Sequence, residues 1–375
     1  MTLRIGMIGG GEGAFIGAVH RMAMRLDGRF QLTAGCFSSR EDVNRRTAAH
    51  LGIAPGRTYP DFETMADGEA ALPEGERIQA VAIVTPNHLH HGPAIRFLER
   101  GFHVLCEKPL TTDMEKAHAI AAAVRDSGRV FVLAHNYTAY PMIREARERI
   151  RRGDLGRIRK VHVEYLQGWL SEPLEESGHP QAAWRTDPSR AGPTGALGDI
   201  GTHAFNLLEH VTGLSVRRVF AHMNTFVADR RLDDDDMVLL DLSDDAAGVL
   251  CVSQVAFGRE NGLMLRVFGE KGSLAWRQEH PEDLEFWEPD GTLSVLRPMG
   301  RRLTPSTLRR SRVPPGHPEG YIESFANLYA SFANAIEGKA DMEAAFPGVE
   351  EGMREMLFLE ACLESSRRDA WKPVG

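Results

Sequence analysis

Residues 3–27, LRIGMIGGGEGAFIGAVHRMAMRLD, decide the fold of the first part of this 375-residue chain. The apolar run 3–9 is typical of a buried strand, and the amphipathic run 14–27 is typical of a helix. Glycines between a strand and a helix form the turn in which dinucleotide-binding folds hold a pyrophosphate against a helix N-terminus. The stretch therefore predicts a dinucleotide site, the alternative being a tight turn of any α/β fold.

Within this turn, Gly9 is expected to make the tight bend, and Gly11 to let the backbone approach the pyrophosphate. Gly17 is expected to permit close helix–strand packing, with Phe15 and Ile16 beside the cofactor. The interval between Gly11 and Gly17 is about three residues longer than in the common GxGxxG pattern. The pyrophosphate contacts are therefore less well defined than the turn itself.

Strands and helices alternate as far as residue 134. The expected strands are 3–9, 30–37, 78–84, 103–106 and 130–134, and the expected helices are 14–27, 41–51, 92–100 and 113–127. Nearly continuous apolar runs between amphipathic helices indicate a parallel sheet covered on both faces. We predict a doubly wound Rossmann domain over 1–134, whose ligand lies beyond the carboxyl ends of the strands.

From residue 135 the pattern changes to an α+β domain, predicted over 135–375. A helix (140–152) and a strand (158–168) precede a long irregular loop at 169–198, which is typical of a lid or binding loop. A helix at 200–212 and successive strands to residue 277 predict a large, mostly antiparallel sheet with one open face. Helices are expected at 319–337 and 346–368.

The bulk composition excludes several classes of protein. A net charge of -8 and a pI near 6.0 argue against a nucleic-acid partner. Four cysteines without a CxxC pair indicate reduced structural thiols. The chain enters a strand at once and contains no long apolar run, so we expect a soluble cytoplasmic protein with no membrane partner.

The carboxyl ends of three predicted strands carry polar side chains. After the second strand, Ser38, Ser39 and Arg40 stand where NAD-binding proteins usually place an acid, so NAD and NADP both remain open, and Arg40 is alternatively a solvated charge. After the strand 78–84, the segment TPNHLHH is predicted to contact the cofactor or to cap the next helix. Its predicted contacts are Thr85, Pro86, Asn87, His88 and His90.

A metal site at His88, His90 and His91 is not expected, because the motif holds no cysteine or carboxylate.

The third strand end is HVLCEKPL, residues 103–110. A lysine beside a cofactor cation can exchange a proton with a substrate hydroxyl, and we predict this role for Lys108. Glu107 would hold its ammonium or contact the nicotinamide ribose, and the Lys108–Pro109 bond is a candidate for the cis form. The alternative is a salt-bridged lysine at a strand end.

Further candidates lie in the second domain. Asp199 and His203 are four residues apart at a helix start, so their side chains share one face of the helix. In the functional interpretation, the Asp199 carboxylate orients the His203 imidazole for proton transfer. In the structural interpretation, Asp199 caps the helix. A second group offers aromatic faces with polar tips, which suit sugar-like ligands. It comprises Tyr137, Tyr165, Gln167 and Trp169, together with Trp184 and Arg185 of the long loop and His317.

His317 is alternatively a helix cap. The run LDDDDM (232–237) is expected to be a solvated turn, and LRRSR (308–312) a surface loop, with an anionic substrate group as the alternative for 309–312.

Taken together, the glycine turn 9–17, TPNHLH (85–90), CEKPL (106–110) and GALGDIGTH (195–203) resemble the Gfo/Idh/MocA family of oxidoreductases over nearly the whole chain. The resemblance implies a Rossmann domain followed by an α/β domain whose open sheet packs against another subunit, giving a homodimer or homotetramer. It also implies that Lys108, Asp199 and His203 surround the hydroxyl that loses hydride. YLQGW and WR are similar to levoglucosan-type sugar dehydrogenases, which implies cofactor contacts for Trp184 and Arg185.

The sequence therefore predicts an NAD- or NADP-dependent dehydrogenase of a sugar, inositol or related polyol. His203 would act as general base, Asp199 would orient it, and Lys108 would polarise the hydroxyl or relay its proton. The substrate contacts would come from these three residues with Tyr137, Gln167, Trp169 and His317. The alternatives are a glycoside hydrolase that works by transient oxidation, a non-catalytic nucleotide-binding regulator on the same fold, and a metal hydrolase.

Overall fold

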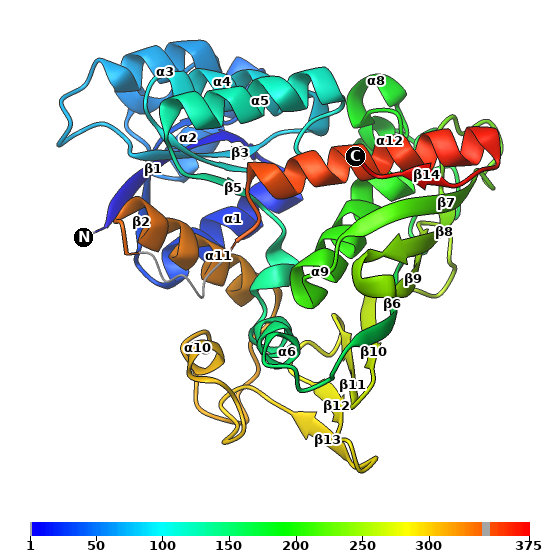
Figure 1. The fold of residues 1–375 in the computed structure, drawn as a ribbon. Coiled ribbons are helices and arrows are strands. Elements are labelled where there is room, and N and C mark those ends of the chain that lie inside the picture. Colours follow the sequence, from blue (N-terminus) through cyan, green and yellow to red (C-terminus); the bar gives the residue numbers. More distant parts are fainter. Residues whose placement is uncertain (1, 340–345) are drawn as a thin grey trace. The chain divides into compact units, whose positions relative to one another are not determined.

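The computed structural model describes residues 2–339 and 346–375 (Figure 1). The chain divides into two compact units, Met1–Asn136 with Tyr321–Met353 and Tyr137–Gly320 with Arg354–Gly375. These units differ from the predicted continuous ranges 1–134 and 135–375. The reason is that helix α11 (Tyr321–Ile336) packs against α1 (Phe15–Leu26) and so belongs to the first unit.

The first unit contains a five-stranded parallel sheet with the strand order β2-β1-β3-β4-β5. Helices α3, α4 and α5 cover one face of the sheet, and α1 and α11 cover the other (Figure 1). The strands are β1 (Leu3–Gly9), β2 (Phe30–Cys36), β3 (Ala80–Val84), β4 (His103–Cys106) and β5 (Phe131–Leu133). The remaining helices are α2 (Glu41–His50), α3 (Phe62–Ala70), α4 (His91–Glu99) and α5 (Met114–Ser127).

The doubly wound prediction is confirmed, and its physical basis is visible in the central strands. All five residues of β3 are buried, as expected for a strand with helices on both faces. Helix α3 was not predicted. It begins at an Asp61 cap, whose carboxylate accepts the N–H of Thr64, but its sequence FETMADGEA lacks a clear apolar repeat and contains Gly68.

The second unit contains a nine-stranded sheet with the order β13-β12-β11-β10-β6-β9-β8-β7-β14. Its pairs are antiparallel except for β6 with β9, so the predicted mostly antiparallel sheet is confirmed. The strands are β6 (Ile158–Leu166), β7 (Val216–Asn224), β8 (Asp235–Leu242), β9 (Ala247–Ser253), β10 (Gly262–Gly269), β11 (Ser273–Arg277), β12 (Leu284–Trp287), β13 (Leu293–Leu296) and β14 (Lys372–Pro373).

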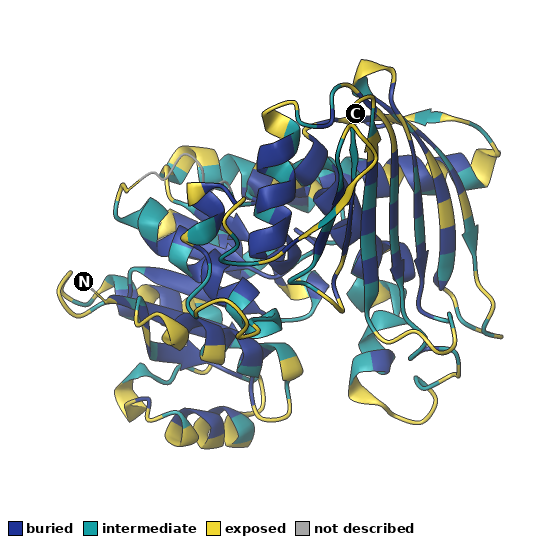
Figure 2. Cartoon of the chain, turned by 90° about the horizontal axis from the view of Figure 1, so that it is seen from below, coloured by how far each residue is buried: buried dark blue, intermediate teal, exposed yellow. Residues whose placement is uncertain are grey.

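One face of this sheet is covered and the other is open. Helices α6 (Pro141–Arg151) and α9 (Thr202–Thr212) pack against the covered face. Buried and more exposed residues alternate along the strands (Figure 2), as the two-residue period of a strand requires. On the open face, Met237 and Leu239 of β8 are each 51% exposed.

The helices that complete the second unit include two that correct a prediction. The segment 169–198 was expected to be irregular, but it contains α7 (Pro180–Arg185) and α8 (Pro188–Ala191). Each begins with proline directly after a residue whose side chain caps the helix, His179 or Asp187. The other helices are a π-helical turn (Leu197–Gly201), α10 (Pro305–Leu308) and α12 (Val349–Arg368), within which the division between the units falls.

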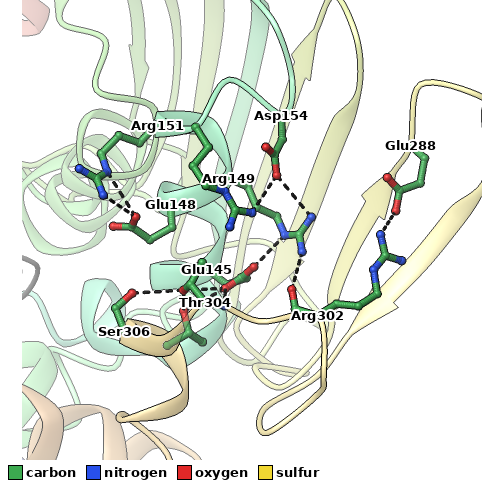
Figure 3. Close-up of polar contacts among 11 residues, drawn as sticks. Glu145, Glu148, Arg149, Arg151, Asp154, Glu288, Arg302, Thr304 and Ser306 are labelled. Carbon is green, nitrogen blue, oxygen red and sulfur yellow. Dashed lines mark hydrogen bonds and ion pairs between the residues drawn. The ribbon is translucent and has the colours of Figure 1, made fainter.

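A buried carboxylate fixes the segment around α10 to α6. Glu145 is fully buried, and one of its oxygens accepts the Arg149 guanidinium at 2.8 Å (Figure 3). The other oxygen accepts the backbone N–H of Thr304 at 3.0 Å and the Thr307 hydroxyl at 3.0 Å. Because a buried carboxylate requires such partners, this network ties two segments together that are far apart in sequence.

Among the described residues, no helix is long and apolar enough to cross a membrane.

Candidate active site

The glycine turn of the first unit is built for close backbone approach. Gly9 and Gly10 have φ angles of 81° and 70°, which favour glycine. A Cβ added to Gly17 would lie 2.3 Å from the Cα of Gly10, so the predicted tight packing of helix on strand is present. A Cβ on Gly11 would lie 2.8 Å from the carbonyl oxygen of Phe37, which places this glycine beside the end of β2. The turn therefore fits a pyrophosphate at the start of α1.

The end of β2 carries exposed polar groups. The Ser38 hydroxyl accepts the backbone N–H of Arg40 at 3.1 Å, and the Arg40 guanidinium pairs with Asp42 at 3.0 Å. Ser39 and Arg40 are exposed, so this edge presents a hydroxyl and a paired guanidinium to solvent. Asn44, which the sequence reasoning did not single out, fixes the strand end by accepting the N–H of Phe37 at 2.7 Å.

The loop after β3 is anchored by a buried histidine. His90 is fully buried, with Nδ1 2.8 Å from the carbonyl oxygen of Pro109 and Nε2 2.9 Å from that of Thr85. Burial lowers the pKa of His90, and the two carbonyl contacts do not offset it. Both ring nitrogens contact backbone carbonyls, so His90 links the loops that follow β3 and β4. Its contact with the cofactor stays a prediction.

The other predicted residues of this loop lie nearer the surface. Thr85, Pro86 and His88 are partly exposed, while Asn87 is buried and begins a short 3₁₀ turn, Asn87–Leu89. Further 3₁₀ turns lie at Pro55–Arg57, Asn136–Ala139 and Ser243–Asp245.

Among the residues that the structure describes, no group of three His, Cys, Asp or Glu side chains is arranged to hold a metal ion.

Lys108 lies at the end of β4, in a turn that includes a cis Lys108–Pro109 peptide bond. The side chain before it, Glu107, is buried: Oε1 lies 2.8 Å from Nε2 of His20, and Oε2 accepts the backbone N–H of Lys108 at 3.1 Å. Burial alone would raise the pKa of Glu107, but the hydrogen bond from His20 and the nearby positive charges outweigh it, and the net effect lowers the pKa. Glu107 is therefore an ionised group at the base of the lysine turn.

In the second unit, Asp199 lies in the π-helical turn Leu197–Gly201, and His203 lies in the first turn of α9. The sequence reasoning expected an ordinary helix start. The wider turn is held by a residue from the aspartate run: Asp233 accepts the N–H groups of Gly195 at 2.6 Å and Leu197 at 2.8 Å. Single π turns inside helices occur frequently at functional sites.

The expectation that residues 232–237 form a solvated turn is wrong, because Asp233, Asp234 and Asp236 are buried. Asp234 accepts two backbone N–H groups and pairs with the guanidinium of Arg230 at 3.1 Å. Burial raises the pKa of Asp236 well above its usual range, and the charge of Asp233 adds to the effect. The run is therefore a buried support of the loop that carries Asp199.

The Asp199 carboxylate accepts hydrogen bonds from two side chains of its own unit, one of them in the long loop. Its Oδ2 accepts Nε of Arg185 at 2.9 Å and Nε2 of Gln254 at 2.9 Å. The Arg185 guanidinium also bonds Oε1 of Gln181 at 2.6 Å and lies 4.2 Å above the ring of Trp184. Arg185, which was predicted to contact the cofactor, is thus hydrogen-bonded to Asp199, which was predicted to be catalytic.

His203 lies against a closed ring of hydrogen bonds. Its imidazole packs edge-on against Tyr137, with centroids 4.8 Å apart, and lies 6.2 Å from the ring of Tyr165. The Tyr165 hydroxyl donates to Oδ1 of Asn261 at 2.6 Å, Nδ2 of Asn261 donates to the Tyr137 hydroxyl at 3.2 Å, and the two hydroxyls are 2.7 Å apart. Each member therefore both donates and accepts, which fixes both tyrosines beside the histidine.

The ring extends to two predicted substrate residues. Nε2 of Gln167 donates to Oδ1 of Asn261 at 2.9 Å, and Nε1 of Trp169 donates to Oε1 of Gln167 at 3.0 Å. Sequence reasoning missed Asn261 and Gln254, since one reads as a turn residue and the other as an ordinary strand-end glutamine. Their role is visible only from their hydrogen-bond partners, which are Tyr165, Gln167 and Tyr137 for Asn261 and Asp199 for Gln254. These partners are far away in the sequence.

His317 lies at a pocket of about 470 Å³ lined by Glu279, His280 and Glu319 among others. The His317 side chain is exposed, with Nδ1 3.2 Å from the carbonyl oxygen of Pro314, so it does not cap α11. Glu279, on the wall of the same pocket, accepts the backbone N–H of Asn261 at 3.0 Å. His317 therefore lines a cavity that borders the hydrogen-bonded ring without belonging to it.

Comparison with known proteins decides the family. A model described as "Oxidoreductase family, NAD-binding Rossmann fold" matches residues 3–135, and a GFO/IDH/MocA C-terminal domain model matches residues 143–275. The crystal structure of an oxidoreductase from Sinorhizobium meliloti is 45% identical, with 99% of each chain covered and a TM-score of 0.91. The chain belongs to the GFO/IDH/MocA oxidoreductase family.

Two other similar proteins are named by their ligand or substrate. An inositol dehydrogenase homologue from Azotobacter vinelandii, solved with NADH and myo-inositol, is 34% identical, covers 100% of this chain and 98% of its own, and has a TM-score of 0.92. Levoglucosan dehydrogenase of Pseudarthrobacter phenanthrenivorans is 28% identical, over 100% of this chain and 98% of its own. The resemblance seen in the sequence is confirmed, and the first unit is an NAD-binding Rossmann domain of this family. Because the model that matches the Rossmann domain describes an oxidoreductase family, the glycosidase, regulator and metal-hydrolase alternatives are not favoured.

Proposed function

We propose that this GFO/IDH/MocA oxidoreductase is a dehydrogenase that removes a hydride from a secondary hydroxyl of a sugar, inositol or related polyol. The observation that carries the proposal is the cluster around His203. An imidazole is held beside two tyrosine hydroxyls, an asparagine and a glutamine, the donor and acceptor groups that recognise a ring bearing several hydroxyls. The similarity to proteins named for inositol and levoglucosan supports the same substrate class.

In this proposal, His203 takes the proton of the reacting hydroxyl. Asp199 holds the local geometry from the π turn, where Arg185 and Gln254 fix its carboxylate. Lys108, carried by the turn after β4, polarises the same hydroxyl or relays its proton. When bound, the nicotinamide accepts the hydride. Tyr137, Gln167, Trp169 and His317 are the proposed substrate contacts.

The proposed cofactor contacts of the first unit are the glycine turn Gly9–Gly17, the serines and Arg40 after β2, the loop 85–88 and Glu107. Their support is the backbone geometry of Gly10 and Gly17, which leaves the start of α1 open to a close approach by a pyrophosphate. Trp184 and Arg185 are retained as proposed cofactor contacts from the second unit. Arg40 fits the 2′-phosphate of NADP, so both cofactors enter the test.

The test is a screen of inositols, levoglucosan, free sugars and glycosides with NAD and NADP. We expect absorbance of the reduced nicotinamide to rise with at least one polyol in stoichiometric proportion to its oxidation. Free sugar is measured in parallel on a chromogenic glycoside. Release of sugar without net reduced cofactor, or no redox reaction with any polyol, would contradict the proposal.

We also propose that the open face of the nine-stranded sheet joins subunits into a homodimer or homotetramer in the cytoplasm. Met237, Leu239 and Phe268 expose apolar side chains on this face, and such patches mark association sites. The four cysteines are free thiols, as in proteins of reducing compartments. Light scattering of the purified chain and of Leu239→Arg tests association, since a charge at an apolar position of such a face is expected to give monomers.

A further inference from the structure

We propose that His20 and Tyr329 are positioning residues that act on Lys108 through Glu107. The inference rests on the proposed catalytic role of Lys108, and it assigns a function to His20 and Tyr329, which are not among the predicted site residues. Three segments of the first unit supply this chain: α1 carries His20, the end of β4 carries Glu107, and α11 carries Tyr329.

The chain is continuous and excluded from water. Nδ1 of His20 lies 2.8 Å from the Tyr329 hydroxyl, and Nε2 lies 2.8 Å from Oε1 of Glu107. His20 is 0% exposed, Tyr329 1% and Glu107 8%. The Phe325 ring packs edge-on against the His20 ring, with centroids 4.8 Å apart. The His20 ring is hydrogen-bonded at both nitrogens and packed against the rings of Phe325 and Tyr329. It is therefore held in one orientation, with Nε2 facing Glu107.

The charges around Glu107 agree with this arrangement. The groups that face its carboxylate are His20 from α1, His90 from the loop after β3, and Lys108 and Cys106 from its own strand end. Tyr329 completes the set from α11. Burial raises the pKa of Tyr329 well above its usual range, and the charge of Glu107 adds to this, so the phenol stays protonated. An ionised Glu107 accepts from Nε2–H of His20, while Nδ1 accepts the O–H of the Tyr329 phenol.

The consequence for Lys108 comes from the second oxygen of Glu107. With Oε1 fixed by His20, Oε2 is left to accept the backbone N–H of Lys108 at 3.1 Å. The carboxylate therefore holds the main chain from which the lysine side chain extends. If His20 is removed, the buried carboxylate loses its main donor and becomes easier to protonate. A protonated Glu107 no longer holds the turn with a full charge.

The experiment compares the pH dependence of kcat for the wild-type enzyme and for His20→Leu, which removes both hydrogen bonds at similar volume. In the wild type, the acid limb of the profile reports protonation of the proposed base His203. In His20→Leu we expect this limb to move to higher pH by about one unit, because protonation of Glu107 then also lowers activity in that range. His20→Gln, which retains an N–H donor, is expected to restore the limb in part. NADH is expected still to bind in all variants, since the glycine turn is untouched, and any change in its affinity is expected to follow the protonation of Glu107, itself a proposed cofactor contact.

Phe325→Leu is the matched control, because it loosens packing on the same ring without removing a hydrogen bond. It is expected to lower Tm while leaving the acid limb in place. If the acid limb of His20→Leu coincides with that of the wild type, or if Phe325→Leu moves it equally, the proposal is overturned. Should His20→Leu fail to fold, Tyr329→Phe is expected to move the limb in the same direction by a smaller amount, and an unmoved limb there also overturns the proposal.

A second readout needs no activity, so it separates failure of this inference from failure of the proposed function. In the wild type, the lowered pKa of Glu107 gives a stabilisation that is present above the unfolded value, about 4.3, and lost as the pH falls below it. In His20→Leu that contribution is lost. The Tm deficit of His20→Leu is therefore expected to be largest at pH 7 and to shrink as the pH falls below about 4.3. A deficit independent of pH would reject the network even in a chain that oxidises no polyol.

Discussion

Replacement of Asn261 by leucine tests whether the hydrogen-bonded ring beside His203 organises the second unit. Leucine has a similar size but can make none of the three side-chain hydrogen bonds, which are those from Tyr165 and Gln167 and that to Tyr137. Each such bond contributes about 1 kcal/mol net to the free energy of unfolding, so loss of all three costs about 3 kcal/mol. Burial of the leucine side chain offsets part of this loss. We expect a loss of about 2 to 3 kcal/mol.

For a unit of this size class, each kcal/mol lowers Tm by about 2–4 °C, so Asn261→Leu is expected to melt about 4–12 °C below the wild type. The two tyrosines then hold His203 less firmly, and we expect kcat/KM for the polyol to fall about tenfold, or about 1.4 kcal/mol. Differential scanning calorimetry gives the first quantity, and steady-state kinetics the second. NADH affinity, measured by fluorescence, is expected to be unchanged.

A double-mutant cycle with Tyr165→Phe isolates the contact itself. If the phenol and the amide interact as the 2.6 Å distance indicates, Tyr165→Phe costs about 1 kcal/mol less in the Asn261→Leu background than in the wild type. Additivity within about 0.3 kcal/mol, or an Asn261→Leu variant with unchanged Tm and kcat/KM, would refute the reasoning.

Three further outcomes are expected. Lys108→Ala lowers kcat by about a hundredfold or more while NADH binding persists; near-native turnover would remove this lysine from the mechanism. Gln254→Leu removes one of the two donors to Asp199, so kcat falls about three- to tenfold with NADH affinity unchanged, as steady-state kinetics and a fluorescence titration will show. Burial, with the charge of Arg129, lowers the pKa of His103 to about 4. The unfolded chain therefore binds this proton first, and stability falls as the pH drops from about 6.5 to 4, a slope that His103→Gln reduces in urea titrations.

The fold of the first unit was predictable because its signals are local. Each strand of the parallel sheet is a short apolar run, and the glycine turn after β1 marks where the first helix begins. The return of α11 to this unit was not predictable. Its aromatic face matches any apolar surface equally well, so the sequence does not say which sheet it covers.

The candidate site shows the same division. Lys108, Asp199 and His203 were found because each stands in a recognisable motif at an element boundary. Asn261 and His20 were missed, since their partners are 96 and 87 residues away in the chain. The aspartate run was misjudged for a related reason. Asp233 is a buried cap for backbone groups 36 and 38 residues away, which no reading of local charge reveals.

The return of α11 limits how the gene can be divided. A fragment ending at Asn136 would lack the Tyr329 and Phe332 side chains that cover Phe30, and that aromatic surface would meet water and promote aggregation. Chimeras that exchange the nucleotide-binding half between homologues therefore need both Met1–Asn136 and Tyr321–Met353 from one parent. A graft made at a single junction would combine His20 of one parent with the α11 of the other, and so would separate His20 from the Tyr329 hydroxyl that lies 2.8 Å from its Nδ1.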